Sequence, residues 1–347
     1  MAAARGLAAM ARAALTATLV MMAVPGCGTS PVPAAPSPLP RILSGVAYAP
    51  AQPAESSGHL LDLYLPADTR KPVPVIIWSE GNGWLDDNGF ADAGQVATWF
   101  NPHGYAVAGI GIRSASQATF PAQLSDIKAA IRFLRTNAGH YHLDGNHIGV
   151  MGDSSGGWAA AMAAVTGDDP ALDGDVGVRG PSSRVQAAAV FYAPTDFAQL
   201  DRDMLGNCVP FNQQFGLSGC ASDPHSPFSQ LIGCPVQTCP DRAAAADPIR
   251  YVSRNDPPML LVHGQQDVAV PWQQSLLLYQ AVQRVSGNAT LVLVPHGQHG
   301  QAFAFLTDPA VDADAQAQTT DNGTQQPAAP VQLSVAYLLS FFDRYLR

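Results

Sequence analysis

A glycine-rich motif around Ser154 is the strongest chemical signal in the sequence. Residues 148–157 read IGVMGDSSGG, so an apolar run leads into G-x-S-x-G and then into a helix-forming stretch. This pattern is typical of a nucleophile elbow, in which a strained turn exposes a serine between a strand and a helix. Glycines are needed at 152 and 156 because side chains there would collide with the adjoining strand and helix. The motif predicts Ser154 as a nucleophile; the serine that follows it is a weaker rival because its own frame lacks the first glycine.

A carboxylate and two histidines follow later strand-like runs. A serine hydroxyl is activated by a base that takes its proton and by a carboxylate that orients the base. One buried apolar run precedes Asp267, and the next precedes His296 and His299. Because the carboxyl ends of parallel strands meet at one edge of a sheet, these side chains can approach Ser154. We predict Asp267 and His299 as the partners, with His296 as the alternative base and a helix N-cap as the alternative role of Asp267.

A second glycine-rich turn could bind the negative charge that develops on a carbonyl oxygen. Residues 75–84, VIIWSEGNGW, form an apolar run that ends in this turn, and such turns expose backbone N–H groups. We predict an oxyanion hole formed by the N–H groups of Gly81, Asn82 and Ser155, the last at a helix N-terminus. The competing interpretation, a phosphate-binding loop, lacks the Lys and Ser/Thr that should follow it.

The elements that position these residues follow from the hydrophobic pattern. From about residue 42 onward, short apolar runs alternate with longer helical patterns, which is typical of parallel strands joined by crossover helices. The first two runs suit antiparallel edge strands and the later ones suit central strands buried on both faces. The fold class is therefore α/β, with a mostly parallel eight-stranded sheet and helices on both faces. The expected strands are Leu43–Ala49, Leu60–Leu65, Val73–Trp78, Ala106–Ile112, Ile148–Met151, Ala187–Tyr192, Met259–Val262 and Leu291–Val294.

Three helices and two insertions complete this pattern. Apolar spacing predicts helices over residues 121–137, 155–165 and 331–346. Residues 196–256 are too long for an ordinary connection and are expected to form a cap over the site. Residues 308–330 are polar and poor in aromatic side chains, so a mobile surface loop is expected there.

The cap insertion contains four of the five cysteines. Their even number suggests two disulfides in an oxidising compartment. Three pairings are possible, and the one with the smallest loops joins Cys208 to Cys220 and Cys234 to Cys239. A zinc site is the alternative, but the spacing contains no C-x-x-C pair. We expect no metal site.

The N-terminus reads as an export signal. Residues 1–27 contain two arginines and an uncharged apolar stretch that is too short for a permanent membrane span. The stretch ends in VPGC, which resembles the lipobox of bacterial lipoproteins and makes Cys27 a candidate for lipidation and membrane tethering; simple cleavage and secretion is the alternative. Residues 28–40 are rich in Pro and Ala and suit a linker, which leaves residues 41–347 as the catalytic domain.

The charge balance excludes one class of partner. The formal net charge is −9, with only 18 Lys and Arg residues in 347. Nucleic-acid-binding proteins concentrate cationic side chains, so no nucleic-acid partner is expected. The oligomeric state cannot be read from this sequence.

The motifs together resemble those of α/β-hydrolase esterases, namely the hormone-sensitive-lipase-like and the bacterial feruloyl-esterase-like (BD-FAE-type) groups, over about residues 55–346. The sequence departs from the family at Glu80, where the turn usually begins with His, and at Asn82, usually Gly. The resemblance implies hydrolysis of small carboxylic esters without a cofactor. The matching segments are residues 61–66, the turn that ends in Trp84, residues 120–123, residues 152–157, and His263-Gly264 with Asp267.

Two other functions remain open at this point. A serine peptidase of the same fold would use the same three side chains, although such enzymes usually carry a large additional domain. A non-catalytic protein could use the pocket to bind a ligand, although a complete Ser, Asp and His set argues against this.

Overall fold

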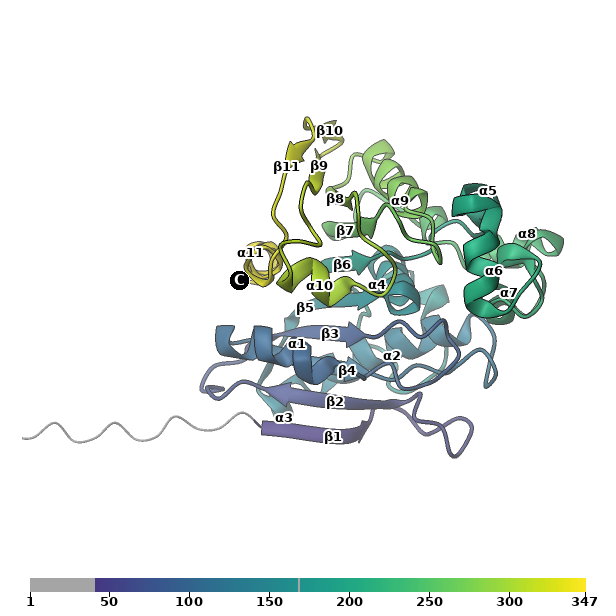
Figure 1. Ribbon diagram of the computed structural model, residues 1–347. Coiled ribbons are helices and arrows are strands. Elements are labelled where there is room, and N and C mark those ends of the chain that lie inside the picture. Colours follow the sequence, from purple (N-terminus) through teal and green to yellow (C-terminus); the bar gives the residue numbers. More distant parts are fainter. Residues whose placement is uncertain (1–40, 168) are drawn as a thin grey trace, which may run out of the picture. The chain divides into compact units, whose positions relative to one another are not determined.

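The computed structural model describes residues 41–347 except residue 168, and a single mixed sheet forms its centre (Figure 1). The predicted signal peptide, Cys27 and the linker lie outside the described residues. The strand order is β1-β2-β4-β3-β5-β6-β7-β8-β9-β10, with β11 paired to β9. Neighbours from β4 to β8 are parallel, and all other pairs are antiparallel. The strands are β1 (Arg41–Ala47), β2 (Leu60–Leu65), β3 (Val73–Ser79), β4 (Ala106–Ile110), β5 (Leu143–Asp153), β6 (Ala187–Phe191), β7 (Met259–Gly264), β8 (Ala289–Val294), β9 (Gln316–Asp321), β10 (Thr324–Gln325) and β11 (Ala329–Pro330).

Helices cover both faces of the sheet and divide the core into two halves. One half packs α2, α4 and α9 against the sheet, and the other packs α1, α10 and α11 against the opposite face (Figure 1). Successive strand residues face opposite sides, so Val150 lies in the first half and Met151 in the second. The helices are α1 (Ala93–Phe100), α2 (Ala122–Thr136), α3 (Ala138–Tyr141), α4 (Ser154–Thr166), α5 (Leu200–Asp203), α6 (Val209–Phe215), α7 (Pro227–Ile232), α8 (Pro240–Ala245), α9 (Gln273–Arg284), α10 (Ala302–Thr307) and α11 (Val335–Leu346).

All eight predicted strands and all three predicted helices are present, with ends that shift by a few residues. Small residues in the central strands let the helices approach closely. A Cβ atom at Gly149 in β5 would lie 2.7 Å from the ring of Phe342 in α11, a contact too short for real atoms. Since packed interiors leave no room for such overlap, this glycine fixes how closely α11 approaches the sheet.

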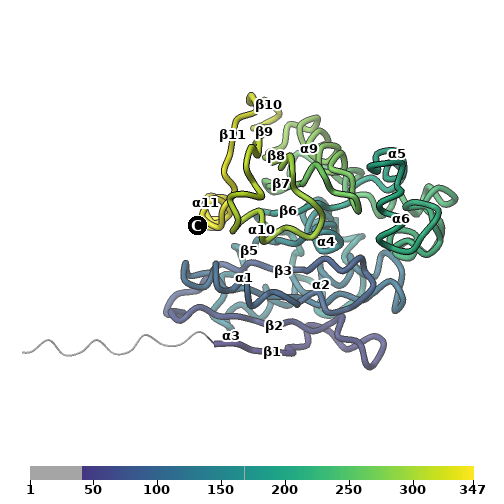
Figure 2. Tube along the Cα trace, viewed as in Figure 1, coloured from purple at the N-terminus to yellow at the C-terminus, as the bar shows by residue number. Residues whose placement is uncertain are grey.

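The expectation of a mobile loop over residues 308–330 is wrong. This segment adds β9, which pairs antiparallel with β8, and then β10 and β11, which both pair with β9 (Figure 2). Most of its side chains are partly or fully exposed because β9 lies near the edge of the sheet. An exposed edge strand needs few apolar residues, which is why its polar sequence resembles that of a loop.

The insertion between β6 and β7 forms a helical cap, which comprises α5 to α8. The cap helices lie at the edge of the sheet toward which the arrow of β3 points (Figure 1). Disulfides join Cys208 to Cys220 and Cys234 to Cys239, the pairing that the sequence favoured. Within the described ranges, no helix combines the length and the apolar character needed to cross a membrane.

Candidate active site

Ser154 lies at the sharp turn between β5 and α4. Its φ angle of 51° is in the left-handed region, which L-residues adopt only when the surroundings enforce it. A Cβ atom at Gly156 would lie 1.9 Å from the backbone oxygen of Ser79, and one at Gly152 would lie 2.4 Å from the backbone oxygen of Gly156. Both glycines are therefore required by the close approach of β3, β5 and α4, as the motif predicts.

The structure brings together the three side chains predicted from distant parts of the chain. His299 follows β8, and its Nε2 lies 3.0 Å from Ser154 Oγ. The other ring nitrogen, Nδ1, lies 2.7 Å from Oδ2 of Asp267, which follows β7. Both distances are within hydrogen-bond range. A carboxylate, an imidazole and a hydroxyl thus form a continuous chain of hydrogen bonds.

Asp267 is held as a buried carboxylate. Its Oδ1 accepts hydrogen bonds from the backbone N–H groups of Ala269 and Val270, each at 2.8 Å. Burial alone would raise its pKa, but the charge of His299 and hydrogen bonds from His263 and His299 hold the pKa of Asp267 well below its ordinary value. The predicted alternative, a helix-capping role, does not describe it, because α9 begins at Gln273 and Trp272 occupies its N-cap position.

His299 is mostly buried and is surrounded by negative charge. Burial alone would lower its pKa, but the charge and hydrogen bond of Asp267, and the charge of Asp153, raise the pKa of His299 above 6.5. His296, the alternative base, is exposed in the same loop. The geometry therefore separates the two histidines that the sequence could only rank.

The predicted oxyanion donors in the glycine-rich turn after β3 have different hydrogen-bond partners. The N–H of Gly81 donates to Oδ1 of Asp153 at 2.8 Å, so it is already bound to a carboxylate. The N–H groups of Asn82 and Gly83 both donate to Ser155 Oγ at 3.0 Å, and Gly83 lines the cavity at Ser154. Gly83, which the sequence prediction did not name, lies in the same turn, and its N–H is directed toward Ser155 Oγ and not toward Asp153.

A tyrosine that the sequence did not indicate links three parts of this site. Tyr192 follows β6, and its hydroxyl donates to Asp153 Oδ2 at 2.9 Å and accepts from the N–H of Ala302 at 3.0 Å. Its ring lies 4.7 Å from the ring of His299, centroid to centroid. Because Asp153 also holds Gly81, Tyr192 connects the nucleophile turn, the glycine-rich turn and the histidine loop. No motif marks a tyrosine at the end of a buried strand as functional.

A small apolar cavity lies beside Ser154 and His299. Its free volume is about 20 Å³, which is room for little more than one water-sized group. The cap supplies aromatic rings to its wall from α6 and α7: Phe211, Phe215 and Phe228. Gly83 and Trp84 of the glycine-rich turn also line the cavity.

Within residues 41–167 and 169–347, no group of three or more His, Cys, Asp or Glu side chains is placed to hold a metal ion.

The chain is similar to known proteins that are named esterases. A family profile described as BD-FAE matches residues 61–282. The protein named Esterase LipQ from Mycobacterium tuberculosis is 28% identical over 74% of this chain, and the chain spans 58% of the length of that relative. Isoprenylcysteine alpha-carbonyl methylesterase from Arabidopsis thaliana is 25% identical over 72% of this chain and 55% of its own length.

Solved structures show the same fold. A truncated carbohydrate esterase from gut microbiota is 31% identical, covers 77% of this chain and 91% of its own, and superposes with a TM-score of 0.64. An esterase from Thermogutta terrifontis in its propionate-bound form is 22% identical, covers 77% of this chain and 86% of its own, and has a TM-score of 0.55.

Proposed function

The chain belongs to the BD-FAE family, and on that premise we propose that it is a serine esterase in which Ser154, His299 and Asp267 hydrolyse carboxylic esters through an acyl-enzyme. The observation that carries the proposal is the continuous hydrogen-bond chain from Asp267 through His299 to Ser154. The named esterases among the relatives support the same reaction.

In the proposed mechanism, Nε2 of His299 takes the proton of Ser154 as Oγ attacks the ester carbonyl carbon. Asp267 accepts a hydrogen bond from Nδ1, which fixes the tautomer with a free Nε2 and stabilises the imidazolium. The imidazolium then donates its proton to the leaving alcohol. Water attacks the acyl-enzyme in the second half, again with His299 as the base, and releases the acid and the free serine.

We assign the oxyanion hole to the N–H groups of Asn82, Gly83 and Ser155. Gly81 has a different role in this proposal, because its N–H holds Asp153 and thereby positions the turn. In the resting site Ser155 Oγ accepts the hydrogen bonds of Asn82 and Gly83, so these donors are already oriented. Preorganised donors of this kind usually contribute about 3 to 4 kcal/mol each to the stabilisation of the transition state.

The cavity supports a short acyl group. A free volume of about 20 Å³ beside Ser154 accommodates a group the size of an acetyl methyl, whereas a longer chain would require the cap phenylalanines to move. The carbohydrate esterase among the solved relatives supports a sugar as the alcohol. We therefore propose acetylated sugars as the substrate class.

Covalent labelling tests the proposed nucleophile. A fluorophosphonate probe should react with the folded protein at one site, and mass spectrometry should locate the adduct on the peptide that contains Ser154. Heat-denatured protein is the control and should not react. No labelling, or an adduct on another peptide, would contradict the proposal, and hydrolysis of aminoacyl amides in preference to esters would favour the peptidase alternative.

The charge around His299 predicts the pH dependence. His299 must be neutral to accept the proton, and the pKa of His299 is raised by the charge of Asp267. The value of kcat/KM for p-nitrophenyl acetate should therefore rise with pH, with a midpoint above the ordinary pKa of a histidine. Asp267→Asn removes the main cause of the raised pKa, so the midpoint of the residual activity should move to lower pH. An NMR titration of the His299 ring in the two proteins measures the same shift directly.

Other groups also titrate in this range, among them Glu80 at the start of the glycine-rich turn and Asp247 in the cap insertion, whose pKa burial raises to about 8. Burial, and the charges of Asp92, Asp153 and Asp86, raise the pKa of Glu80 to about 7. Glu80→Gln is therefore the matched control. The rise of kcat/KM with pH should persist in this variant. Its disappearance would show that the rise reports the titration of Glu80 and not of His299.

A further inference from the structure

A stripe of aromatic side chains runs along α11, remote in sequence from the proposed catalytic residues. Tyr337, Phe341 and Tyr345 are four residues apart and therefore lie on one face of the helix. They are only partly buried, whereas Leu338 and Phe342 form the fully buried face. The rings of Phe341 and Tyr345 have centroids 5.4 Å apart. This stripe thus borders the core and also presents ring surface to the outside.

The facing wall is built from hydroxyl-bearing side chains of β8 and β9. Thr290 and Thr319 are cross-strand partners, and their Oγ1 atoms lie 3.1 Å apart. Asp321, the last residue of β9, and Gln326, which follows β10, extend the polar wall and are exposed. Threonine hydroxyls donate and accept, and carboxylate and amide groups add further acceptors and donors. One wall is therefore aromatic and the other is polar.

These two walls enclose a cleft, named here the α11 cleft, of about 440 Å³. That volume is within the range of small-molecule sites. Arg344 and Asp321 line the cleft with opposite charges, so it carries no excess charge that would select an anion or a cation. Arg344 lies over the ring of Tyr345, with its guanidinium carbon 5.5 Å from the ring centroid.

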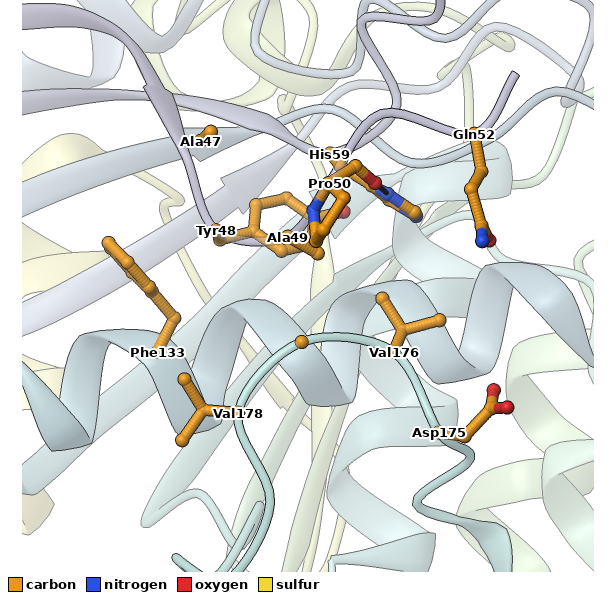
Figure 3. Close-up of a pocket in the computed structure, with 11 residues that line it drawn as sticks. Ala47, Tyr48, Ala49, Pro50, Gln52, His59, Phe133, Asp175, Val176 and Val178 are labelled. Atoms are coloured by element: carbon orange, nitrogen blue, oxygen red, sulfur yellow. Dashed lines mark hydrogen bonds between the residues drawn. The ribbon is translucent and has the colours of Figure 1, made fainter. Parts of the chain in front are cut away.

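A larger cavity of about 730 Å³ is less suited to a polar ligand (Figure 3). It lies between the segment that contains Tyr48 and the segment that contains Val176 (Figure 3). The Tyr48 hydroxyl is hydrogen-bonded to backbone oxygens. The two ring nitrogens of His59 are hydrogen-bonded to the backbone oxygen of Pro50 and to the carboxylate of Asp126. These polar groups are engaged within the protein, and the exposed polar side chains of this cavity are Gln52 and Asp175. The α11 cleft presents exposed amide, carboxylate and guanidinium groups beside its aromatic wall.

We propose that the α11 cleft binds a neutral sugar chain. Sugars present apolar C–H faces, which pack on aromatic rings, and hydroxyl edges, which need donors and acceptors. The two walls match these two surfaces. The inference rests on the proposed function in one respect: the ester that the active site cleaves would be attached to the same polysaccharide that the cleft binds.

The position of the cleft fits a site that anchors the polymer without obstructing the reaction. Met259 and Ala289, which line it, are the first residues of β7 and β8, whereas Asp267 and His299 follow the carboxyl ends of these strands. The cleft and the proposed catalytic centre therefore lie at opposite edges of the sheet. Most of the residues that line it, from Asn288 to Tyr345, also lie outside the segment 61–282 that the family profile matches.

Binding to sugars without ester groups tests the cleft independently of catalysis. Xylohexaose, cellohexaose and mannohexaose are titrated into the full-length protein by calorimetry. At least one should bind, and Tyr345→Ala should weaken that binding by about twofold to tenfold, the range expected for one aromatic contact. Tyr345→Phe retains the ring and should retain most of the binding. Tyr141→Ala, a partly buried aromatic residue on α3 that does not line the cleft, should bind as the unsubstituted protein does.

Hydrolysis separates this proposal from that of the active site. Tyr345→Ala should keep its rate on p-nitrophenyl acetate and lose rate on acetylated xylan. If none of the three oligosaccharides binds, or if Tyr345→Ala binds like the unsubstituted protein, the α11 cleft is not a sugar site, while the esterase proposal is unaffected. Conversely, if Ser154 proved not to be the nucleophile, the calorimetric result would stand, because these sugars carry no ester.

Discussion

Replacing Ser154 with alanine should lower kcat for p-nitrophenyl acetate by a factor on the order of 10⁵ to 10⁶. The substitution removes the atom that would form the acyl-enzyme, and in a site whose three residues act as a unit, loss of the nucleophile removes nearly all the benefit of the other two. A residual rate above that of the uncatalysed reaction should persist, because the oxyanion donors still bind the substrate. KM should change much less than kcat.

The fold should survive this substitution. Serine and alanine pay a similar steric cost at the φ of 51° observed here, and the side chain lost is a single oxygen in a partly exposed position. An unchanged thermal unfolding temperature would show that the activity is lost through chemistry. Ser155→Ala is the matched control: it retains the backbone N–H but removes the Oγ that accepts from Asn82 and Gly83, and kcat should fall by about tenfold. Full turnover by Ser154→Ala would show that the nucleophile lies elsewhere.

The sequence predicts the part of the site that depends on chain topology. Ser154, Asp267 and His299 each follow a buried parallel strand, so the rule that strand ends converge was enough to bring them together. Gly152 and Gly156 were predictable for a related reason: a nucleophile elbow is a sharp, strained turn, and a Cβ atom at these positions would lie 2.4 and 1.9 Å from backbone oxygen atoms. These features depend on local pattern and strand order.

The features that sequence reasoning missed depend on contacts between distant residues or on strands with little hydrophobic pattern. Whether Gly81 or Gly83 faces the cavity is decided by the Asp153 carboxylate, which binds the N–H of Gly81. Tyr192 acts through two hydrogen bonds to residues 39 and 110 positions away, and no spacing rule encodes such contacts. The strands β9 to β11 were missed because an edge strand needs little hydrophobicity. The narrow cavity could not be foreseen either, because it depends on how the cap places its phenylalanines.

Replacing His299 with glutamine should be nearly as damaging as losing the nucleophile, with kcat lowered by a factor on the order of 10⁵ to 10⁶. Glutamine can still donate a hydrogen bond toward Asp267, but its amide cannot accept the proton of Ser154 at neutral pH. The residual rate should therefore lose the pH-dependent limb that His299 produces, and the fluorophosphonate should label the variant slowly.

His296→Gln is a matched control in the same loop. Because His296 is exposed, this variant should stay within about twofold of the unsubstituted rate and should keep the limb. The two variants make the same chemical change three residues apart. A difference between their activities would therefore come from the position of His299 and not from the loss of an imidazole in general. A large loss in His296→Gln with turnover kept in His299→Gln would exchange their roles, and would require the loop after β8 to rearrange before the reaction.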